Sequence, residues 1–392
     1  MMQRLIPVLL ALILLAGCSD VGPEIQPPKE AELIQPALTY ENAYNGPLYD
    51  AGFHAAKDAD LQLLIADMDR NGVNWAISYF AVQGAQSRTA LTTSQGLGRI
   101  LATVQENPGR VLPFINPGLS PTEATATLDS LLPMMYAEAL RSSEEISPGA
   151  ISGLGEMEQY AWQTGPDDNR VMELYRMAAA ANKSVSMRIS AGQARAMQQV
   201  LETFPETKFI IRMSPEDLRK DRTAIMQLLK KYPNLYYGIG PDQIMTGPET
   251  GSPLLPGQES FDDNSDEMLA RAVQLYKPLD DGAPEKIVWS TDIRAKDSLE
   301  PEAYDKLIEF SRRFIFRMEM EHQDKVAYKN ALSAFGKGVT IRQPVVVEDT
   351  SSWNKCNDEQ KQHCNEQCLP IPKETPESAS CQKACTNRIK CL

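Results

Sequence analysis

The stretch Leu48–Gly72, LYDAGFHAAKDADLQLLIADMDRNG, holds one strand-like run followed by one helical pattern. Leu48–His54 is short and mostly apolar, as a buried strand is. In Asp60–Asn71 the apolar residues recur at helical spacing and share one face, and Gly72 is a typical residue for ending a helix. The stretch therefore predicts a strand followed directly by a helix that packs on it. The residues on the shared face are Leu61, Leu64, Ile65 and Met68.

Seven more strand-like runs follow, and helical patterns, such as Asn169–Ala181, separate them. A chain that alternates strand and helix eight times predicts a parallel sheet closed into a (β/α)8 barrel. An open doubly wound sheet is the alternative, but no Gly-x-Gly-x-x-Gly turn opens the first helix. The seven runs are Trp75–Ala81, Val111–Asn116, Ala150–Glu156, Ser184–Ile189, Lys208–Met213, Leu235–Ile239 and Ile287–Ser290.

Two segments depart from this regular alternation. Thr122–Leu140 predicts a long helix that bends or breaks near Pro133, because proline has no N–H to donate. Gly240–Asn264 is dense in glycine and proline and predicts a long loop after the seventh strand. Such a loop at the carboxyl end of a barrel strand is either a lid over a site or a surface insertion, and both remain open.

The N-terminal region predicts export. Residues 1–17 carry Arg4 and then an apolar run that is too short for a comfortable membrane span, as in a signal peptide. Leu15-Ala16-Gly17-Cys18 resembles a bacterial lipobox, which implies cleavage before Cys18 and acylation of that cysteine. An ordinary secretory signal is the alternative. Residues 18–43 would then be a lipidated cysteine and a flexible linker.

The expected location follows from the same resemblance. Ser19 stands where an aspartate would favour retention at the inner membrane, so we expect an outer-membrane lipoprotein that faces the periplasm. The inner membrane and the cell surface are the alternatives. The net charge of −13 argues against nucleic acid as a partner, and against binding to anionic lipid beyond the acylated Cys18.

Residues 341–392 contain the six cysteines other than Cys18. In an exported chain this even number predicts disulfides. Two Cys-x-x-x-Cys spacings place each pair of sulfurs on one helical face, which favours a stapled helical hairpin. Zinc, assisted by His363, is the alternative. The tail is either a contact surface for an envelope protein or a cap on the barrel. The expected pairs are Cys356–Cys391, Cys364–Cys385 and Cys368–Cys381.

Several short motifs between the two terminal regions occur in the order of a known family. At these motifs residues 44–340 resemble the amidohydrolase-related branch (amidohydrolase 2) of the amidohydrolase superfamily. The resemblance implies a barrel with its site at the carboxyl ends of the strands. It also implies a hydrolase, lactonase or decarboxylase that is metal-assisted or, in some members, metal-free. The motifs are Tyr49–His54, Met68–Val73, Gly153–Glu156, Phe204–Ile211, Tyr232–Tyr237, Ile287–Asp292, Asn330-Ala331 and Phe335-Gly336.

The histidines that bind metal in that family are largely replaced here. The family's first strand ends Asp-x-His-x-His, and in this chain Gly52 takes the first histidine position while His54 keeps the second. The fifth and sixth strands, which end near a histidine in the family, offer Arg188 and either Arg212 or Met213. A guanidinium binds anions and does not ligate metals, so the resemblance implies a depleted metal site.

Acidic residues remain at two strand ends, and three hypotheses for the role of the residues at these ends stay open. The resemblance matches Glu156 to a fourth-strand acid and Asp292 to the aspartate that binds metal or takes a proton from water. In the first hypothesis, His54, Glu156 and Asp292 hold one divalent cation. In the second, Arg188 and Arg212, grouped with Glu156, bind an anionic substrate, while Asp292 is the general base and His54 orients or donates a proton. In the third, the arginines pair with the acids in a buried ion network.

These hypotheses lead to two predicted functions. One is a hydrolase of a small anionic ester, lactone or amide. The other is a catalytically inactive barrel that binds a small ligand or supports an envelope partner. We expect no organic cofactor, and one divalent cation is the alternative.

Overall fold

The computed structural model describes Tyr40 and residues 42–55, 58–81, 92–116, 132–158, 164–240, 259–294 and 301–336 of the chain. The predicted signal peptide, the acylated Cys18 and the Cys-rich tail with its three disulfides lie outside these residues. The predicted loop Gly240–Asn264 is described only at its two ends. Its last six residues belong to a helix that begins at Glu259, so the loop is shorter than predicted.

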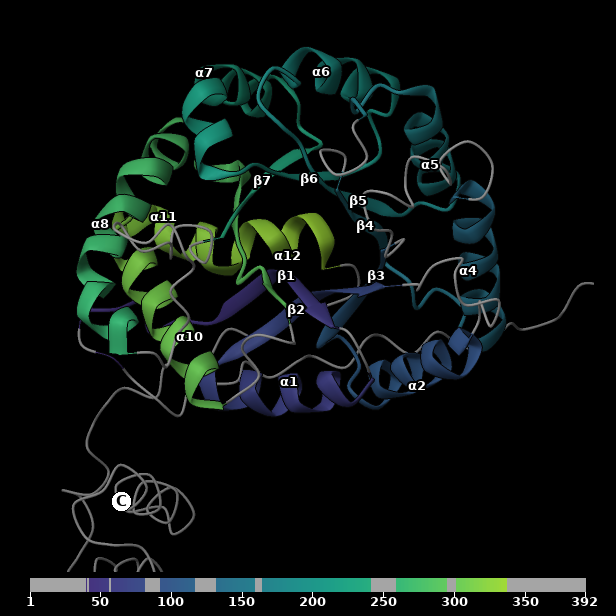
Figure 1. Ribbon diagram of the computed structural model, residues 1–392, viewed down its shortest axis with the longest axis horizontal. Helices are drawn as coiled ribbons and strands as arrows, with labels where there is room; N and C mark the ends of the chain where they lie inside the picture. The colour runs from purple at the N-terminus through teal and green to yellow at the C-terminus, as the bar shows by residue number, and fades with distance from the viewer. Residues whose placement is uncertain are drawn as a thin grey trace, which may run out of the picture.

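Eight parallel strands follow one another in sequence order around a closed sheet (Figure 1). Each strand pairs in parallel with its sequence neighbour, and a short ninth strand completes the sheet beside the first. The predicted (β/α)8 barrel is therefore confirmed, and the open doubly wound sheet is wrong. The strands are β1 (Leu48–Ala55), β2 (Val73–Ala81), β3 (Val111–Asn116), β4 (Gly153–Glu158), β5 (Ser184–Arg188), β6 (Phe209–Arg212), β7 (Leu235–Ile239), β8 (Ile287–Trp289) and β9 (Ile293–Arg294).

The eighth strand is interrupted where the barrel closes. β8 pairs with β7, whereas β9 pairs with Phe53 and His54 of β1. Between them Asp292 has φ 55°, in the left-handed region that residues other than glycine rarely adopt. The N–H of Asp292 donates to the carbonyl of Gly52 at 2.9 Å. This turn lets one segment pair with both neighbouring strands.

An outer ring of helices surrounds the strands (Figure 1). α4 begins at Leu132, so Pro133 lies in its first turn, where its missing N–H costs no helical hydrogen bond. The part of the predicted helix before Leu132 lies outside the described residues, so the bend or break near Pro133 stays a prediction. No helix in the described part of the chain has the length and apolar character needed to cross a membrane. The ring helices are α1 (Asp58–Asn71), α2 (Thr92–Glu106), α4 (Leu132–Ile146), α5 (Asn169–Ala180), α6 (Ala194–Thr203), α7 (Pro215–Lys231), α8 (Glu259–Gly282) and α10 (Pro301–Phe316).

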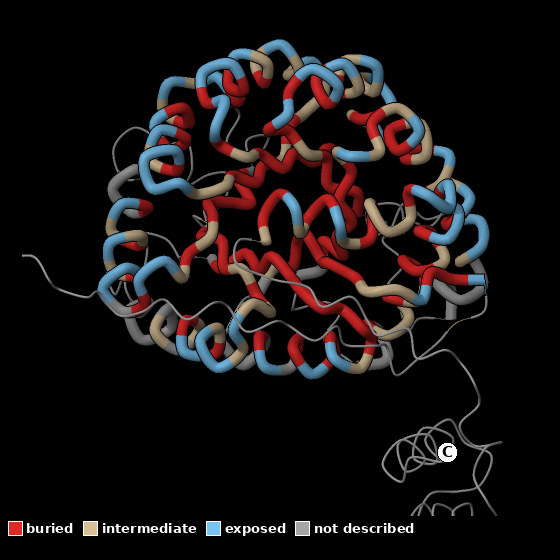
Figure 2. Tube along the Cα trace, turned by 180° about the vertical axis from the view of Figure 1, so that it is seen from behind, coloured by how far each residue is buried: buried red, intermediate tan, exposed pale blue. Residues whose placement is uncertain are grey.

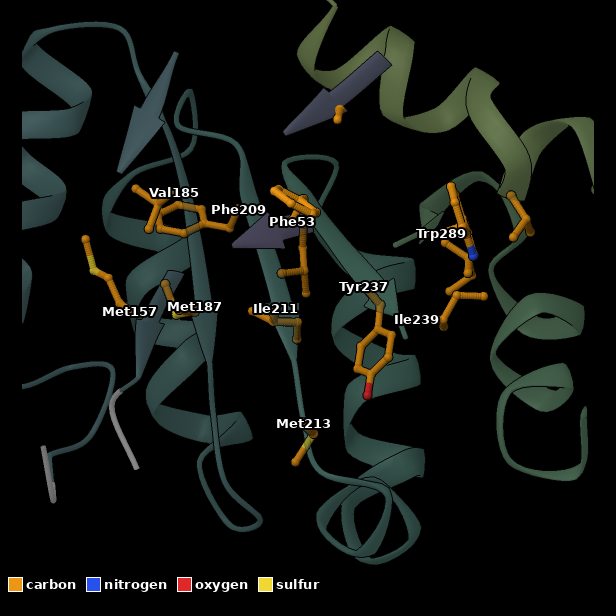
Figure 3. Packing of buried hydrophobic residues seen from close by; sticks show 14 of the residues in the cluster. Phe53, Met157, Val185, Met187, Phe209, Ile211, Met213, Tyr237, Ile239 and Trp289 are labelled. Atoms are coloured by element: carbon orange, nitrogen blue, oxygen red, sulfur yellow. The ribbon is translucent and has the colours of Figure 1, made fainter. Parts of the chain in front are cut away.

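Side-chain alternation along the strands divides the core into two layers. Side chains of one parity, such as Phe209 and Ile211 on β6, pack in the layer between strands and helices (Figure 3). Side chains of the other parity fill the barrel interior, including Ile210 on the same strand. Figure 2 shows the buried positions concentrated in the strands and on the inner faces of the helices. Alternation therefore directs Arg212 into the barrel.

The amino-terminal end of the barrel is covered by the last described helices. These are α11 (Met320–Asp324), the π-helical turn η3 (Lys325–Lys329) and α12 (Asn330–Phe335). Tyr328 stacks on Trp75 near the start of β2, and Nδ2 of Asn330 donates to the carbonyl of Ile287 at the start of β8 at 2.7 Å. A functional site inside the strands must therefore open at the opposite, carboxyl end.

Candidate functional site

Five charged side chains meet at the carboxyl end of the barrel. They come from β1, β4, β5, β6 and the turn after β8, and parallel strands present their carboxyl ends at one edge. The predicted convergence is therefore observed. Each is joined to at least one other by an ion pair, and the five are His54, Glu156, Arg188, Arg212 and Asp292.

Glu156 lies at the centre of this group. Its Oε1 accepts from Nη1 of Arg212 at 2.6 Å, and its Oε2 accepts from Nε of Arg188 at 2.7 Å. Nε2 of His54 lies 3.5 Å from the same Oε2. The Glu156 side chain has no exposed surface. Gly155, just before it, has φ 125°, and a Cβ there would lie 2.2 Å from the carbonyl oxygen of Ser186, so this close approach requires glycine.

Asp292 joins the other side of the group. Its Oδ1 lies 3.3 Å from Nε2 of His54, and its Oδ2 accepts from Nη2 of Arg188. The His54 ring packs against Tyr79, with ring centroids 4.9 Å apart. The side chains of Arg188 and His54 are 18% and 14% exposed, whereas that of Asp292 is 1% exposed. Of the five side chains, only those of Arg188 and His54 are therefore partly exposed at the mouth.

Arg212 is the deepest of the five and is completely buried. Its Nη1 donates to the hydroxyl of Tyr79 at 2.9 Å as well as to Glu156, and its Nη2 donates to the carbonyl of Ala51 at 2.7 Å. Arg212 thus lies behind Glu156 and has no exposed surface with which to contact a ligand. This placement differs from the substrate clamp predicted for it, and Arg188 is the arginine that reaches the mouth.

The electrostatics of the group follow from these contacts. Burial raises the pKa of Glu156 and of Asp292, but the Arg188 and Arg212 guanidiniums and the hydrogen bond to His54 together outweigh burial and hold both pKa values below their usual range. Burial lowers the pKa of His54, but its hydrogen bonds to Asp292 and Glu156 outweigh burial and raise that pKa. Both acids are therefore ionised at neutral pH, and protonation of His54 is favoured.

The acids and His54 have the composition of a metal site but not its charge balance. One ligand atom from each of His54, Glu156 and Asp292 lies within 4.8 Å of the others. All four carboxylate oxygens, however, already contact a guanidinium or the imidazole. A divalent cation would have to displace Arg188 and would meet like charge beside it. Because these oxygens are already occupied, the donor set as observed does not fit a metal ion. Cation binding by His54, Glu156 and Asp292 stays a prediction.

A second group with metal-ligand composition lies between α8 and α11. It comprises Asp280, Asp281 and His322. Nδ1 of His322 lies 3.0 Å from Oδ2 of Asp280, and Nζ of Lys277 donates to Asp281 and, at 2.9 Å, to Glu319. An ammonium in contact with one of the acids makes this group an ion-pair connection between helices.

Tyr79 and Asp50 were not predicted as site residues, and Met213 was left as an alternative to Arg212. Tyr79 bridges Arg212 and Ser186, and Asp50 accepts hydrogen bonds from Thr291 at 2.6 and 2.9 Å. Burial raises the pKa of Asp50 to about 6. Asp50 occupies the acidic position of the first-strand motif, which was the available signal. Met213 packs in the hydrophobic layer outside the strands, so Arg212 is the sixth-strand residue at the site.

Comparison with protein-family models finds no match, and neither does comparison with curated proteins. Solved structures of amidohydrolases and decarboxylases are similar in structure to this chain. A probable 2-pyrone-4,6-dicarboxylic acid hydrolase from Acinetobacter baumannii, with citric acid bound, is 14% identical over 74% of this chain and 99% of its own, with TM-score 0.47.

Two other structures show a comparable likeness. An amidohydrolase from Burkholderia multivorans with bound zinc is 12% identical over 74% of this chain and 99% of its own, with TM-score 0.44. The 5-carboxyvanillate decarboxylase from Novosphingobium aromaticivorans, complexed with manganese, is 11% identical over 77% and 98%, with TM-score 0.42. Identities this low do not carry the activities of these proteins over to this chain.

Proposed function

We propose that the carboxyl end of this barrel binds a small carboxylated anion without a metal ion. The observation that carries the proposal is that the negative groups of the site lie deeper than two of its positive groups. The carboxylates of Glu156 and Asp292 are buried, whereas Arg188 and His54 are the members of the group exposed at the mouth. A ligand that approaches the mouth therefore meets a guanidinium and an imidazole whose protonation is favoured.

The ion network explains why these groups are ready for a ligand. Arg188 is fixed by two carboxylates through Nε and Nη2, so its planar guanidinium has one orientation. His54 is held by Glu156 and Asp292. Groups that are already ordered lose little conformational entropy when a ligand binds. The buried network of ion pairs between the arginines and the acids therefore supports binding, because it orders Arg188 and His54 before a ligand arrives.

The test is calorimetric titration of citrate into the full chain. In Arg188→Gln we expect a Kd about 10-fold or more higher, since a charge-assisted hydrogen bond is worth roughly 1.5–3 kcal/mol. The matched control is Arg176→Gln on α5, where the arginine pairs with Glu173 on an exposed helix face. Absence of citrate binding up to millimolar concentrations, or equal loss in the control, would rule out the proposal.

Hydrolysis of a small anionic ester, lactone or amide is the second candidate. The observation that favours it is the left-handed backbone of Asp292 beside His54, because strained backbone is enriched at active sites. The low pKa of Asp292 makes it a weak base, so its part would be to hold His54 as the proton donor to a leaving oxygen.

A panel of carboxylated lactones and esters tests this second candidate. Under the hydrolase hypothesis, Asp292→Asn abolishes turnover, whereas Arg176→Gln on the exposed face of α5 leaves turnover within about twofold. If the unaltered chain turns over none of these compounds but binds citrate, the barrel is a binding protein.

A further inference from the structure

Arg212 occupies a space that two glycines leave open. A Cβ at Gly52 on β1 would lie 2.2 Å from Nη2 of Arg212, and a Cβ at Gly238 on β7 would lie 2.7 Å from its Nε. Neither glycine has a positive φ, so backbone conformation does not require glycine at either position. What both positions require is room for the guanidinium.

The contacts of this guanidinium are all with buried groups. It bonds to Glu156, to the Tyr79 hydroxyl and to the carbonyl of Ala51, and its Cζ lies 5.6 Å from the centroid of the Tyr79 ring. Burial lowers the pKa of Arg212, but Tyr79, Glu156 and Asp292 together raise it above the usual value of arginine, so this guanidinium stays charged. The positive charge beside Glu156 is therefore permanent and shielded from exchange with ions in solution.

We propose that Arg212 is a positioning residue that supplies Glu156 with the positive charge that a metal ion would otherwise provide. The charge acts through Glu156, because the opposite oxygen of that carboxylate holds Arg188 and faces His54. The inference rests on the proposed function for the ligand at the mouth, but the role of Arg212 is tested without that ligand.

The inference predicts competition between Arg212 and a cation. His54, Glu156 and Asp292 are close enough to share one ion, and two guanidiniums lie against the same carboxylates. Removing Arg188 alone leaves Arg212 bonded to Glu156, so a cation still meets a fixed like charge. Removing both leaves three ligands and no competing guanidinium.

Mn²⁺ titrated into chelator-treated full chain, followed by calorimetry, tests this competition. We expect Arg188→Met/Arg212→Met to bind one equivalent at least about tenfold more tightly than Arg188→Met. Arg188→Met/Arg212→Lys keeps the charge and should restore the exclusion. Adding His54→Gln should abolish the gained binding, which separates this site from Asp280, Asp281 and His322. If Arg188→Met alone binds Mn²⁺ as tightly as the double variant, the inference is wrong.

A thermal double-mutant cycle keeps the inference testable if the double arginine variant does not fold. Gly52→Ala should lower Tm by roughly 5 °C, because its methyl group overlaps the guanidinium. In the Arg212→Met background the same change should cost less than about 3 °C. Equal costs in both backgrounds would show that Gly52 does not make room for Arg212.

The two proposals fail separately. If citrate does not bind but Mn²⁺ uptake follows the expected pattern, the binding function is wrong and the role of Arg212 stands. If citrate binds but Arg188→Met takes up Mn²⁺ as well as the double variant, the binding function stands and Arg212 is an ordinary buried ion-pair partner.

Discussion

Two arginines are buried in different regions of this barrel, and their partners differ. Arg212 lies inside the carboxyl-terminal mouth, and Arg312 lies on α10, where the chain before β1 crosses the end of α1. Neither has exposed surface, and within the described residues neither Nε has a hydrogen-bond partner. Burial alone therefore does not distinguish a site residue from a structural one.

The groups that accept their hydrogen bonds do distinguish them. Arg212 contacts the carboxylate of Glu156, which is shared with Arg188. Arg312 donates instead to the carbonyls of Tyr44, Gly46 and Asn71 at 2.6–2.8 Å. Burial lowers the pKa of Arg312 to about 10. A buried arginine bonded to carbonyls ties segments together, whereas one bonded to a shared carboxylate sets the charge of its neighbours.

The largest expected effect comes from Arg312→Met. Three buried carbonyls lose their donor, and we expect roughly 3–5 kcal/mol of lost stability and a fall in Tm of about 10 °C. Citrate binding at low temperature should stay within about twofold. Calorimetric melts and citrate titrations measure both quantities. In Arg212→Met we expect a similar fall in Tm together with weaker citrate binding. Equal weakening of binding by both variants would remove the distinction between the two regions.

A smaller effect is expected from Tyr79→Phe. The Tyr79 hydroxyl accepts from Arg212 and contacts Ala51 and Ser186, so its loss leaves buried groups unsatisfied. We expect a cost of about 1–2 kcal/mol and a Tm lower by about 4 °C. Tyr136→Phe is the matched control, because that hydroxyl is buried without a partner in the described chain. A cost in the control as large as in Tyr79→Phe would show that the bonds to Arg212 are not responsible.

A further effect depends on pH and acts on the mouth alone. The folded-state pKa of His54 is raised above 6.5, so the stability it adds is fully present below pH 6.5 and is lost as pH rises through the folded pKa. The same loss of charge should weaken citrate binding by about 3- to 10-fold as pH rises from 6.5 through the folded-state pKa of His54. Titrations at several pH values measure it. His54→Gln should give a flat profile over this range, and Arg312→Met should keep the slope of the unaltered chain.

Strand patterning was enough to predict where the site lies. His54, Glu156, Arg188 and Asp292 each stand at the end of a strand-like run, and parallel strands bring such residues to one edge whatever the loops do. Eight strand-and-helix units also predicted the closed barrel. The depth of each side chain was not predictable, because it depends on space across the barrel that no local pattern encodes.

Arg212 shows what the local pattern misses. The space for its guanidinium is left by Gly52 and Gly238, which are far from Arg212 in the sequence. From the sequence, the depth of Arg212 therefore could not be distinguished from that of Arg188. A usable signal was present, since glycine inside a strand often marks a place where another group approaches closely. The left-handed turn at Asp292 was hidden for a different reason. Aspartate tolerates the left-handed conformation, but an aspartate in a sequence does not by itself predict that conformation.

The smallest effect is expected from Arg141→Gln on α4. Arg141 pairs with Glu138 and Glu145, so it has two carboxylate partners, as Arg188 does, but its side chain is 59% exposed. Water and salt screen exposed pairs, so we expect Tm to change by no more than about 1 °C and citrate binding not to change at all. A melt of Arg141→Gln beside Arg212→Met measures the difference. If the two variants lost equal stability, the number of ion pairs would decide the outcome, and the contrast between the buried mouth and the exposed helix face would have no energetic basis.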